Sequence, residues 1–500
     1  MRAFPIGREI PVAGAASVPA TRDLGERGAG MARTEAPPGS ASGLDRYFHI
    51  SARGSTVRTE IVAGAATWLT MAYILFVNPA ILGFIGIPGL QKEGLPFAQV
   101  LTVTALVAGV MTIAMGVYAN YPFALAAGLG LNAFVAFTLV AHDGLSFPDA
   151  MGVIVAEGIL ITILVLTGLR EAILNAIPMD LKRAIGIGIG LFIAFIGFVN
   201  AGIVVHPEGG APIVTIASDL STLRILVFAI GLVITAALVA RHVRGALLIG
   251  IVVTTVVAIV INEVWGHATI WATTPGVGVV PDKIVAAPDF ALVGNFSFHF
   301  WSALGTWTAI AVVLSVMLSD FFDTMGTVIG LGGEAGLLDE KGRLPGINRV
   351  LLVDSLAAAA GGAASASSNT TFIESASGVA EGGRTGLSSV VVGLLFLLAL
   401  FFSPIAGVIP PEATAPVLIL VGYFMMTLVR DIDWADPGIG IPVFLTMVVM
   451  PFTFSITNGV GAGFLSYTLI EVLRGRALKV HPLMYLVSAV FLWYFIHGVV

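Results

Sequence analysis

The stretch "SDFFDTMGTVIGLGGEAG" at residues 319–336 places two carboxylates, Asp320 and Asp323, inside an apolar run. The preceding residues, "WTAIAVVLSVML" at 307–318, carry no charge, so the whole region has the composition of a membrane span. On a helix, residues three apart lie on one face about a turn from each other. Each carboxylate costs roughly 3 kcal/mol at the centre of a span, so a pair without neighbouring Lys or Arg predicts a function or a shared proton.

The composition of the chain excludes a soluble domain. Hydrophobic residues make up 57% of the sequence and charged residues 11%, whereas soluble domains carry about 25% charged residues. Apolar runs of about 20 residues recur from residue 61 to the end, which is typical of a polytopic helical membrane protein and not of a barrel. Cysteine is absent, so disulfides, thiolate metal sites and cysteine nucleophiles are excluded.

Fourteen apolar segments are predicted to span the membrane, and a further apolar stretch at 481–499 is either a fifteenth span or an interfacial segment. The fourteen are 61–87, 97–118, 121–140, 150–168, 182–205, 222–240, 245–263, 306–331, 347–361, 363–380, 386–403, 412–429, 438–455 and 458–473. The Gly-, Ala-, Pro- and Arg-rich residues 1–59 are predicted to form a disordered cytoplasmic tail, in which Met31 is an alternative start to Met1.

The distribution of basic residues predicts a cytoplasmic N-terminus. When the loops alternate from that side, every Lys and Arg from Arg46 onward falls on the inner face except Lys92, Arg224 and Lys283. Cytoplasmic loops of membrane proteins carry an excess of Lys and Arg, so the pattern supports both the count and the orientation.

Seven spans followed by seven more place the second half upside down relative to the first, as in inverted-repeat transporters. Two matching segments, "YPFALAAGLGLNAF" at 121–134 and "GGAASASSNTTFIES" at 361–375, are rich in small residues and unsuited to continuous helices. Broken backbone at membrane depth is tolerated only where it faces protein, water or ligand. The third and tenth spans are therefore predicted to meet at one midplane pocket.

Several polar residues in these segments are candidates for that pocket. Like charges at close range favour protonation, which makes Asp320 and Asp323 a plausible proton carrier, although both could instead cap the broken backbone of the tenth span. Glu374 stands near the start of a helix at Ile373, where free amides stabilise a carboxylate that accepts hydrogen bonds from a ligand; simple helix capping is the alternative.

Amide and aromatic side chains accompany these acids. Asn132, and Asn369 before Glu374, offer donors and an acceptor that suit the edge of a heterocycle, or else bond neighbouring helices. Phe134, Phe321 and Phe372 sit beside these polar positions and either stack on a flat ring or belong to the core or the lipid-facing surface. Glu157 in "VIVAEGILITI" either relays protons or bonds a neighbouring helix. Structural roles are favoured for two further acids, Asp354, paired with Arg349, and Glu412, near the interface.

At these residues the chain resembles the nucleobase/ascorbate transporter family, and within it the azaguanine-type permeases for adenine, guanine and hypoxanthine. The matching motifs are "TWLTMAYILFVNPAIL" at 67–82, "AAGLGLNAF" at 126–134, "SDFFDTMGT" at 319–327 and "SSNTTFIESASGVAEGGRTG" at 367–386. The pattern after Glu374, "ESASGVAEGG", differs from the uracil, xanthine and ascorbate branches, so their specificities do not transfer.

The resemblance implies an all-α polytopic membrane protein of about fourteen helices in two inverted seven-helix repeats, with short strands in spans 3 and 10. It divides the chain into a tail (1–59), a core domain (60–168 and 301–404) and a gate domain (169–300 and 405–500). Asp320, Glu374, Asn132, Phe372, Phe134 and Ile373 are expected to bind the purine. Asp323, Asp320, Glu374 and Glu157 are expected to couple protons.

The residues and the resemblance together predict a proton-coupled purine permease that works by alternating access in the plasma membrane. Its expected partners are a purine nucleobase, protons, the lipid bilayer and a second copy of the chain, with no nucleic acid, cofactor or metal. One alternative is an anion transporter or channel on the same fold, which would place a cation near the site. A membrane-embedded enzyme is a weaker alternative: prenyltransferase-type Asp-x-x-Asp sites need further carboxylates and basic residues, and an intramembrane aspartyl protease would need a Gly-x-Gly-Asp context that "GLGGEAG" lacks.

Overall fold

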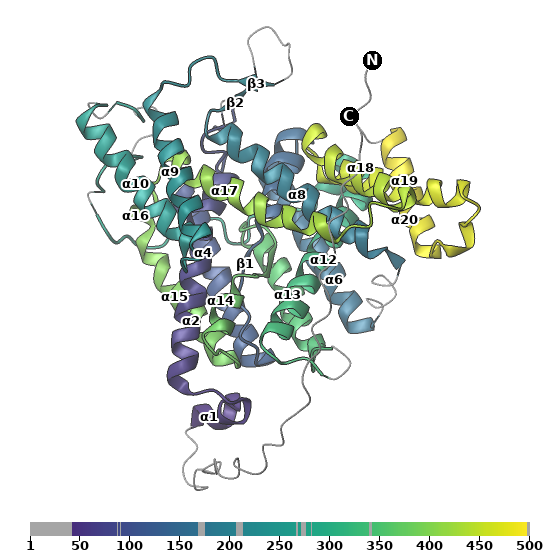
Figure 1. The fold of residues 1–500 in the computed structure, drawn as a ribbon, viewed down its shortest axis with the longest axis horizontal. Coiled ribbons are helices and arrows are strands. Elements are labelled where there is room, and N and C mark those ends of the chain that lie inside the picture. Colours follow the sequence, from purple (N-terminus) through teal and green to yellow (C-terminus); the bar gives the residue numbers. More distant parts are fainter. Residues whose placement is uncertain are drawn as a thin grey trace, which may run out of the picture. The chain divides into compact units, whose positions relative to one another are not determined.

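A computed structural model describes the chain from residue 43 onward, apart from residues 88, 91, 169–175, 207–213, 267–268, 272–276, 282, 340–342 and 498–500 (Figure 1). Most of the predicted tail, the basic residues Arg170 and Lys341, and the last residues of the 481–499 segment lie outside the described residues. Residues 43–59, predicted to belong to the tail, form α1, η1 and the beginning of α2.

The first half of the described chain contains helices and three short strands. In order they are α1 (Gly43–Phe48), η1 (Ser51–Arg53), α2 (Val57–Met71), α3 (Ile74–Leu82), α4 (Phe97–Ala114), the π-helix η2 (Met115–Ala119), β1 (Leu125–Ala127), α5 (Leu129–Ala133), the π-helix η3 (Phe134–His142), α6 (Phe147–Thr167), α8 (Met179–Asn200), β2 (Val204–Val205), β3 (Thr215–Ile216), α9 (Leu223–Ala240) and α10 (Ala246–Val264).

The second half repeats the order of long helices with another strand at the matching place. Its elements are α11 (Phe300–Leu304), α12 (Thr306–Glu334), α13 (Ile347–Ala363), β4 (Asn369–Thr371), α14 (Ser375–Ala380), α15 (Gly386–Ala399), η4 (Leu400–Phe402), α16 (Ser403–Ala406), α17 (Pro411–Met426), η5 (Thr427–Asp431), α18 (Pro437–Thr453), α19 (Ile456–Leu473), η6 (Ala477–Lys479) and α20 (Pro482–His497).

Polar caps and breaks set the ends of several membrane helices. Thr56, Ser146 and Ser455 stand at helix N-termini and accept hydrogen bonds from backbone amides three residues on, which satisfies free donors of the first turn. The first span is broken between α2 and α3, and Pro79 lies inside α3. The break turns Tyr73, the N-cap residue of α3, into the protein interior, where it is 1% exposed.

Ten helical segments of the described chain are long and apolar enough to cross a membrane. They correspond to predicted spans 1, 2, 4 to 8, 11, 12 and 14. The remaining predicted spans are shorter: α5 with η3, α13, α14 with β4, and α18. The sixteen residues of α20 rise about 24 Å, less than the hydrocarbon core of a bilayer, and α20 packs against α19 and α12.

The two broken spans meet as a pair of antiparallel strands. Leu125, Ala126 and Ala127 of β1 pair with Thr371, Thr370 and Asn369 of β4, in that order. Figure 1 shows β1 inside the bundle, among helices from both halves. Antiparallel pairing of matching segments is what an inverted repeat produces at its pseudo-two-fold axis. The short strands predicted in spans 3 and 10 are therefore present.

The helices of the two halves pack against each other in matching pairs. In one group, α2 packs against α14 and α15, α4 against α15, and α6 against α13. In another, α8 packs against α17 and α18, and α9 against α10 and α17. The long helix α12 contacts both groups, since it lies against α6 and also against α8 and α19.

Candidate substrate cavity

A cavity of about 650 Å³ lies where α12, α8 and α17 approach the strand pair. The β1–α5 corner contributes Gly128, Gly130 and Leu131, and the residue after β4 contributes Ile373. The volume lies within the range of small-molecule sites, which is about 300–1,000 Å³. Among the other lining residues are Ser319, Phe322, Asp323 and Thr327 of α12, Lys182 and Arg183 of α8, and Met425 of α17.

Two of the predicted site residues line this cavity. Asp323 is exposed to it from α12, and Ile373 is 55% exposed between β4 and α14. Glu374 follows Ile373 and is half-buried; its carboxylate accepts a hydrogen bond of 2.6 Å from the Tyr73 hydroxyl. Asp323 interacts electrostatically with both Glu374 and Asp320, so the three acids share one neighbourhood.

Asp320 points away from the cavity, into the protein. It is 1% exposed, and its Oδ2 accepts a hydrogen bond of 3.0 Å from the Ser368 hydroxyl. Its carboxyl group lies beside that of Glu157 on α6, which is fully buried. Although Asp320 and Asp323 are a single turn apart, their side chains therefore meet different surroundings.

The other predicted binding residues are buried behind the cavity wall. Asn132 is fully buried, and neither atom of its amide has a hydrogen-bond partner among the described residues. The amide of Asn369 is in the same state. Phe134 in η3 and Phe372 after β4 are 1% and 6% exposed and do not line the cavity. A binding role for these residues stays a prediction.

Side chains from two helices, α13 and α4, satisfy free backbone groups of the strand pair. Asp354 on α13 accepts hydrogen bonds from the Thr371 amide at 2.9 Å and hydroxyl at 2.7 Å, and from the Thr324 hydroxyl at 2.8 Å. Thr112 on α4 bonds both the amide and the carbonyl of Leu125. Unpaired backbone groups are costly at membrane depth, so these bonds hold the strands in place.

Asp354 and Glu412 both bond neighbouring elements, and the partner of Asp354 differs from the predicted Arg349. Asp354 bonds β4 and α12, and the described residues show no ion pair between it and Arg349. Glu412 is 3% exposed at the start of α17 and accepts a 3.0 Å hydrogen bond from the Trp271 indole.

Two residues of the site are not among those predicted from the sequence. Tyr73, whose hydroxyl donates a hydrogen bond to Glu374, stands in the quoted motif of the first span and is buried behind the cavity lining. Lys182 was counted only as a cytoplasmic charge, yet it lines the cavity with its ammonium 5.1 Å from the centre of the Phe322 ring. The signal for Lys182 was its place at the first residue of a predicted span. No group of three His, Asp or Glu residues in the described chain is arranged to hold a metal.

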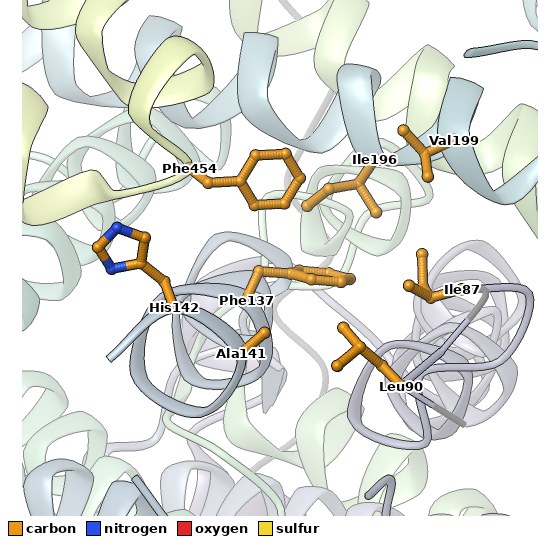
Figure 2. A pocket seen from close by; sticks show the side chains of 8 residues that line it. All are labelled: Ile87, Leu90, Phe137, Ala141, His142, Ile196, Val199 and Phe454. Carbon is orange, nitrogen blue, oxygen red and sulfur yellow. The ribbon is translucent and has the colours of Figure 1, made fainter. Parts of the chain in front are cut away.

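A second, smaller cavity of about 310 Å³ lies toward the other end of α8. Figure 2 shows Phe137 and Phe454 facing each other across it, with Ile196 and Val199 of α8 above and Ile87 and Leu90 opposite. Between the parts of α8 that line the two cavities stands Phe192, fully buried. Its ring lies edge-on to Phe454 at 5.2 Å and to Phe137 at 6.4 Å. An aromatic cluster thus separates the cavities along this helix.

The fold and the site define a class of protein. Many membrane spans, two halves that pair through broken segments, and a cavity where those segments meet are the features of an inverted-repeat membrane transporter.

Known proteins place the chain within that class. A model of a permease family, the xanthine/uracil permeases, matches residues 58–461. The adenine permease AdeQ of Escherichia coli is 39% identical over 449 residues, covering 90% of this chain and 95% of the relative. The guanine/hypoxanthine permease PbuG of Bacillus subtilis is 38% identical over 455 residues, covering 91% and 99%. The chain therefore belongs to this permease family, the nucleobase/ascorbate transporters.

Structural likeness supports the same fold class. The transmembrane domain of the cyanobacterial bicarbonate transporter BicA aligns with a TM-score of 0.58 at 14% identity, covering 81% of this chain and 97% of that domain. The predicted all-α polytopic fold with two inverted repeats is confirmed. The relatives are permeases, so the chain is a multi-pass membrane transport protein and not an enzyme.

Proposed function

We propose that the protein imports purine nucleobases by proton symport. The observation that carries this proposal is a cavity of about 650 Å³ at the meeting point of the two broken spans, which Asp323 and Ile373 line and beside which Glu374 follows Ile373 in the chain. Relatives that match nearly their whole length to this chain are named adenine and guanine/hypoxanthine permeases. The motifs at 126–134 and 319–327, which resemble those of the purine permeases, contribute residues to the cavity and support the same class of substrate here.

The chemistry of the cavity suits a flat nitrogenous ring. Hypoxanthine and guanine present an N1–H donor, and guanine adds an exocyclic amine, so a carboxylate accepts one or two hydrogen bonds. Glu374 already accepts one from Tyr73, which orients it and leaves its other oxygen for the ligand. Hydrogen bonds to charged groups contribute roughly 1.5–3 kcal/mol each.

Ile373 and Phe322 supply apolar surface for the faces of the ring. Asn132 lies in α5, whose residues Gly130 and Leu131 line the cavity, and Phe372 precedes the lining residue Ile373; Phe134 is the first residue of η3, directly after α5. In this proposal they shape the wall and contact the purine when the wall rearranges. Asp320 and Glu157 belong, with Asp323 and Glu374, to the acids that hold the coupled proton.

Transport proceeds in this proposal by movement of a core domain (60–168 and 301–404) against a gate domain (169–300 and 405–500). Helices α2, α4, α6 and α13–α15 pack together, and α8 packs with α17 and α18. The cavity has one wall on α12 and the strand pair and the other on α8 and α17. A cavity between two such groups, closed toward Val199 by the aromatic cluster, suits an inward-open state.

The placement of the protein in the cell follows from charge. We place the N-terminus and the Lys182 end of α8 in the cytoplasm, because basic residues concentrate in the loops of that side. The membrane is the plasma membrane, where import of a purine from the medium takes place. The resemblance to known permeases supports a homodimer.

Counterflow of labelled hypoxanthine into proteoliposomes tests the site. Asp323→Asn and Glu374→Gln are expected to lose most of the counterflow, because each removes a carboxylate that faces or borders the cavity. Glu334→Gln, an exposed acid at the end of the same α12, is the matched control. Normal counterflow in both site variants would refute the assignment, and the absence of any purine transport by the unaltered protein would refute the function.

Anion transport is a second candidate, and one observation favours it. Lys182 and Arg183 line the same cavity as Asp323, and a cation near the site is what an anion carrier requires. Arg183 is paired with Asp180 at 3.3 Å, and the Lys182 ammonium lies 5.1 Å from the centre of the Phe322 ring. Uptake of labelled bicarbonate decides between the two. Bicarbonate transport that Lys182→Gln abolishes, without hypoxanthine counterflow, would establish the anion carrier.

A further inference from the structure

Two carboxyl groups are neighbours inside the protein, on the side of α12 that faces away from the cavity. Glu157 stands at the middle of α6 and Asp320 on α12, and their carboxyl groups interact with each other. Glu157 is fully buried and Asp320 is 1% exposed. Helix α6 also packs closely against α13 at Gly158, where an added Cβ would clash with the backbone amide of Ala359.

Two hydroxyl donors, those of Ser368 and Thr370, lie near this pair, and only the Ser368 hydroxyl bonds it. The Ser368 hydroxyl lies near both acids but donates its single hydrogen to Asp320 Oδ2. The Thr324 hydroxyl donates to Asp354, so its 2.7 Å contact with Thr370 uses the hydrogen of Thr370. Both oxygens of Glu157 and Oδ1 of Asp320 consequently have no partner among the described residues.

The charged groups that face the pair are acidic. Asp354 on α13 interacts electrostatically with Glu157 and Asp320. Asp323, on the next turn of α12, interacts electrostatically with Asp320. Helix α11, which also packs on α6, has no titratable residue, and His142 at the end of η3 is bound to Asp143. Lys182 stands on the cavity side, against Phe322. No described cation therefore neutralises the pair.

Two neighbouring ionised carboxylates, with one hydroxyl donor between them and no cation, would repel each other strongly in a dry interior. One shared proton removes the repulsion and supplies the missing hydrogen bond between the two groups. We propose that the Glu157–Asp320 pair is the site at which the coupled proton is carried. This inference rests on the proposed function, since it assigns the proton of that transport cycle.

The pair is linked to the substrate cavity on two sides. Asp323 is exposed to the cavity one turn from Asp320, which gives the proton a route from the cavity to the pair. The hydroxyl of Ser368 bonds Asp320, and the backbone carbonyl of Ser368 accepts a hydrogen bond of 2.9 Å from the Gly128 amide. Gly128 in turn lines the cavity. Loss of the proton would force the two carboxylates apart and shift this wall. The proton enters from the external solution with the purine and leaves to the cytoplasm.

The variant Glu157→Gln distinguishes two roles of Glu157: carrying a proton, and bonding α6 to α12. Glutamine keeps the size of the side chain and can donate a hydrogen bond to Asp320, but it cannot gain or lose a charge. The variant is expected to retain hypoxanthine counterflow, which needs no net proton movement. It is expected to lose accumulation driven by a pH gradient, for which each pH unit supports about a tenfold concentration ratio at one proton per purine.

The measurement uses reconstituted full-length protein and three readouts: counterflow, accumulation under a pH gradient, and proton flux followed by a pH dye. Glu263→Gln, an exposed glutamate in α10, is the matched control and should behave as the unaltered protein. Glu157→Asp, which restores an acid, should regain part of the accumulation. Wild-type accumulation and proton flux in Glu157→Gln would overturn the proposal.

Infrared spectroscopy tests the pair without any transport. The unaltered protein should show the carbonyl stretching band of a buried protonated carboxylic acid, and Glu157→Gln should lose it. Absence of such a band would overturn the proposal even if purine transport is normal. Its presence in a protein that moves no purine would mean that the substrate assignment is wrong while the proton site stands.

Discussion

At the scale of single residues, the acids of the site differ by what surrounds them. Asp323 faces the cavity, Glu374 is oriented by a tyrosine, and Asp320 is paired with another acid in the interior. The sequence gives all of them the same apolar context. Their roles follow from burial and from the number of hydrogen-bond donors each one meets.

Removal of the Tyr73 hydroxyl should weaken substrate binding. Tyr73→Phe takes away the 2.6 Å bond to Glu374, which leaves the carboxylate less well oriented. Because hydrogen bonds to charged groups contribute roughly 1.5–3 kcal/mol, the apparent KM for hypoxanthine should rise about tenfold or more. Tyr485→Phe, which loses only a bond to the Ala477 carbonyl, is the control. An unchanged KM in Tyr73→Phe would show that Glu374 does not depend on this contact.

At the scale of elements, the strand pair is the feature that positions the site. β1 and β4 are three residues each, too short to be stable alone, and are held by Thr112 and Asp354. Glycine at position 128 permits the close approach of the two strands, since a Cβ there would lie 2.8 Å from Thr370 Cγ2. The β1–α5 corner that lines the cavity therefore requires a residue without a side chain at position 128.

Gly128→Ala should destabilise the protein through that contact alone, because the φ of −69° at this position suits any residue. Overpacking of this kind costs roughly 1–3 kcal/mol, which lowers the thermal midpoint of the purified protein. Adding Thr370→Ser removes the clashing Cγ2 and keeps the hydroxyl that bonds Thr324. The double variant should regain most of the lost stability. If it melts no higher than Gly128→Ala, the steric account is wrong.

At the scale of the whole molecule, the two cavities and the aromatic cluster between them predict a closed external side. Phe192→Ala should open a path, since the ring stands between the segments of α8 that line each cavity. The natural chain has no cysteine, so Thr327→Cys gives a single label in the larger cavity. An impermeant thiol reagent added from the Val199 side should react faster when Phe192 is also replaced. The control is Phe396→Ala, and an equal rate in both would exclude the cluster as a barrier.

The sequence predicted the arrangement of the spans better than the lining of the site. Small residues around Gly128 and Ser368 marked the broken spans, because helices cannot continue through them at membrane depth without a ligand or a partner. The direction of Asp320 could not be predicted, since it depends on whether α6 or α8 packs against that side of α12. That Lys182 lines the cavity could not be predicted for the same reason, because the packing of helices from distant parts of the chain decides which charged residues reach the cavity.

Protection of a single cysteine by substrate tests the central claim most directly. Ile373→Cys, in a chain with no other cysteine, places a thiol between the strand pair and Glu374, and Ala141→Cys in the smaller cavity serves as the reference. The account predicts that hypoxanthine slows maleimide labelling at position 373 in a concentration-dependent manner and leaves position 141 unaffected. Labelling at position 373 that proceeds at the same rate with saturating hypoxanthine, in a variant that still transports it, would contradict the account.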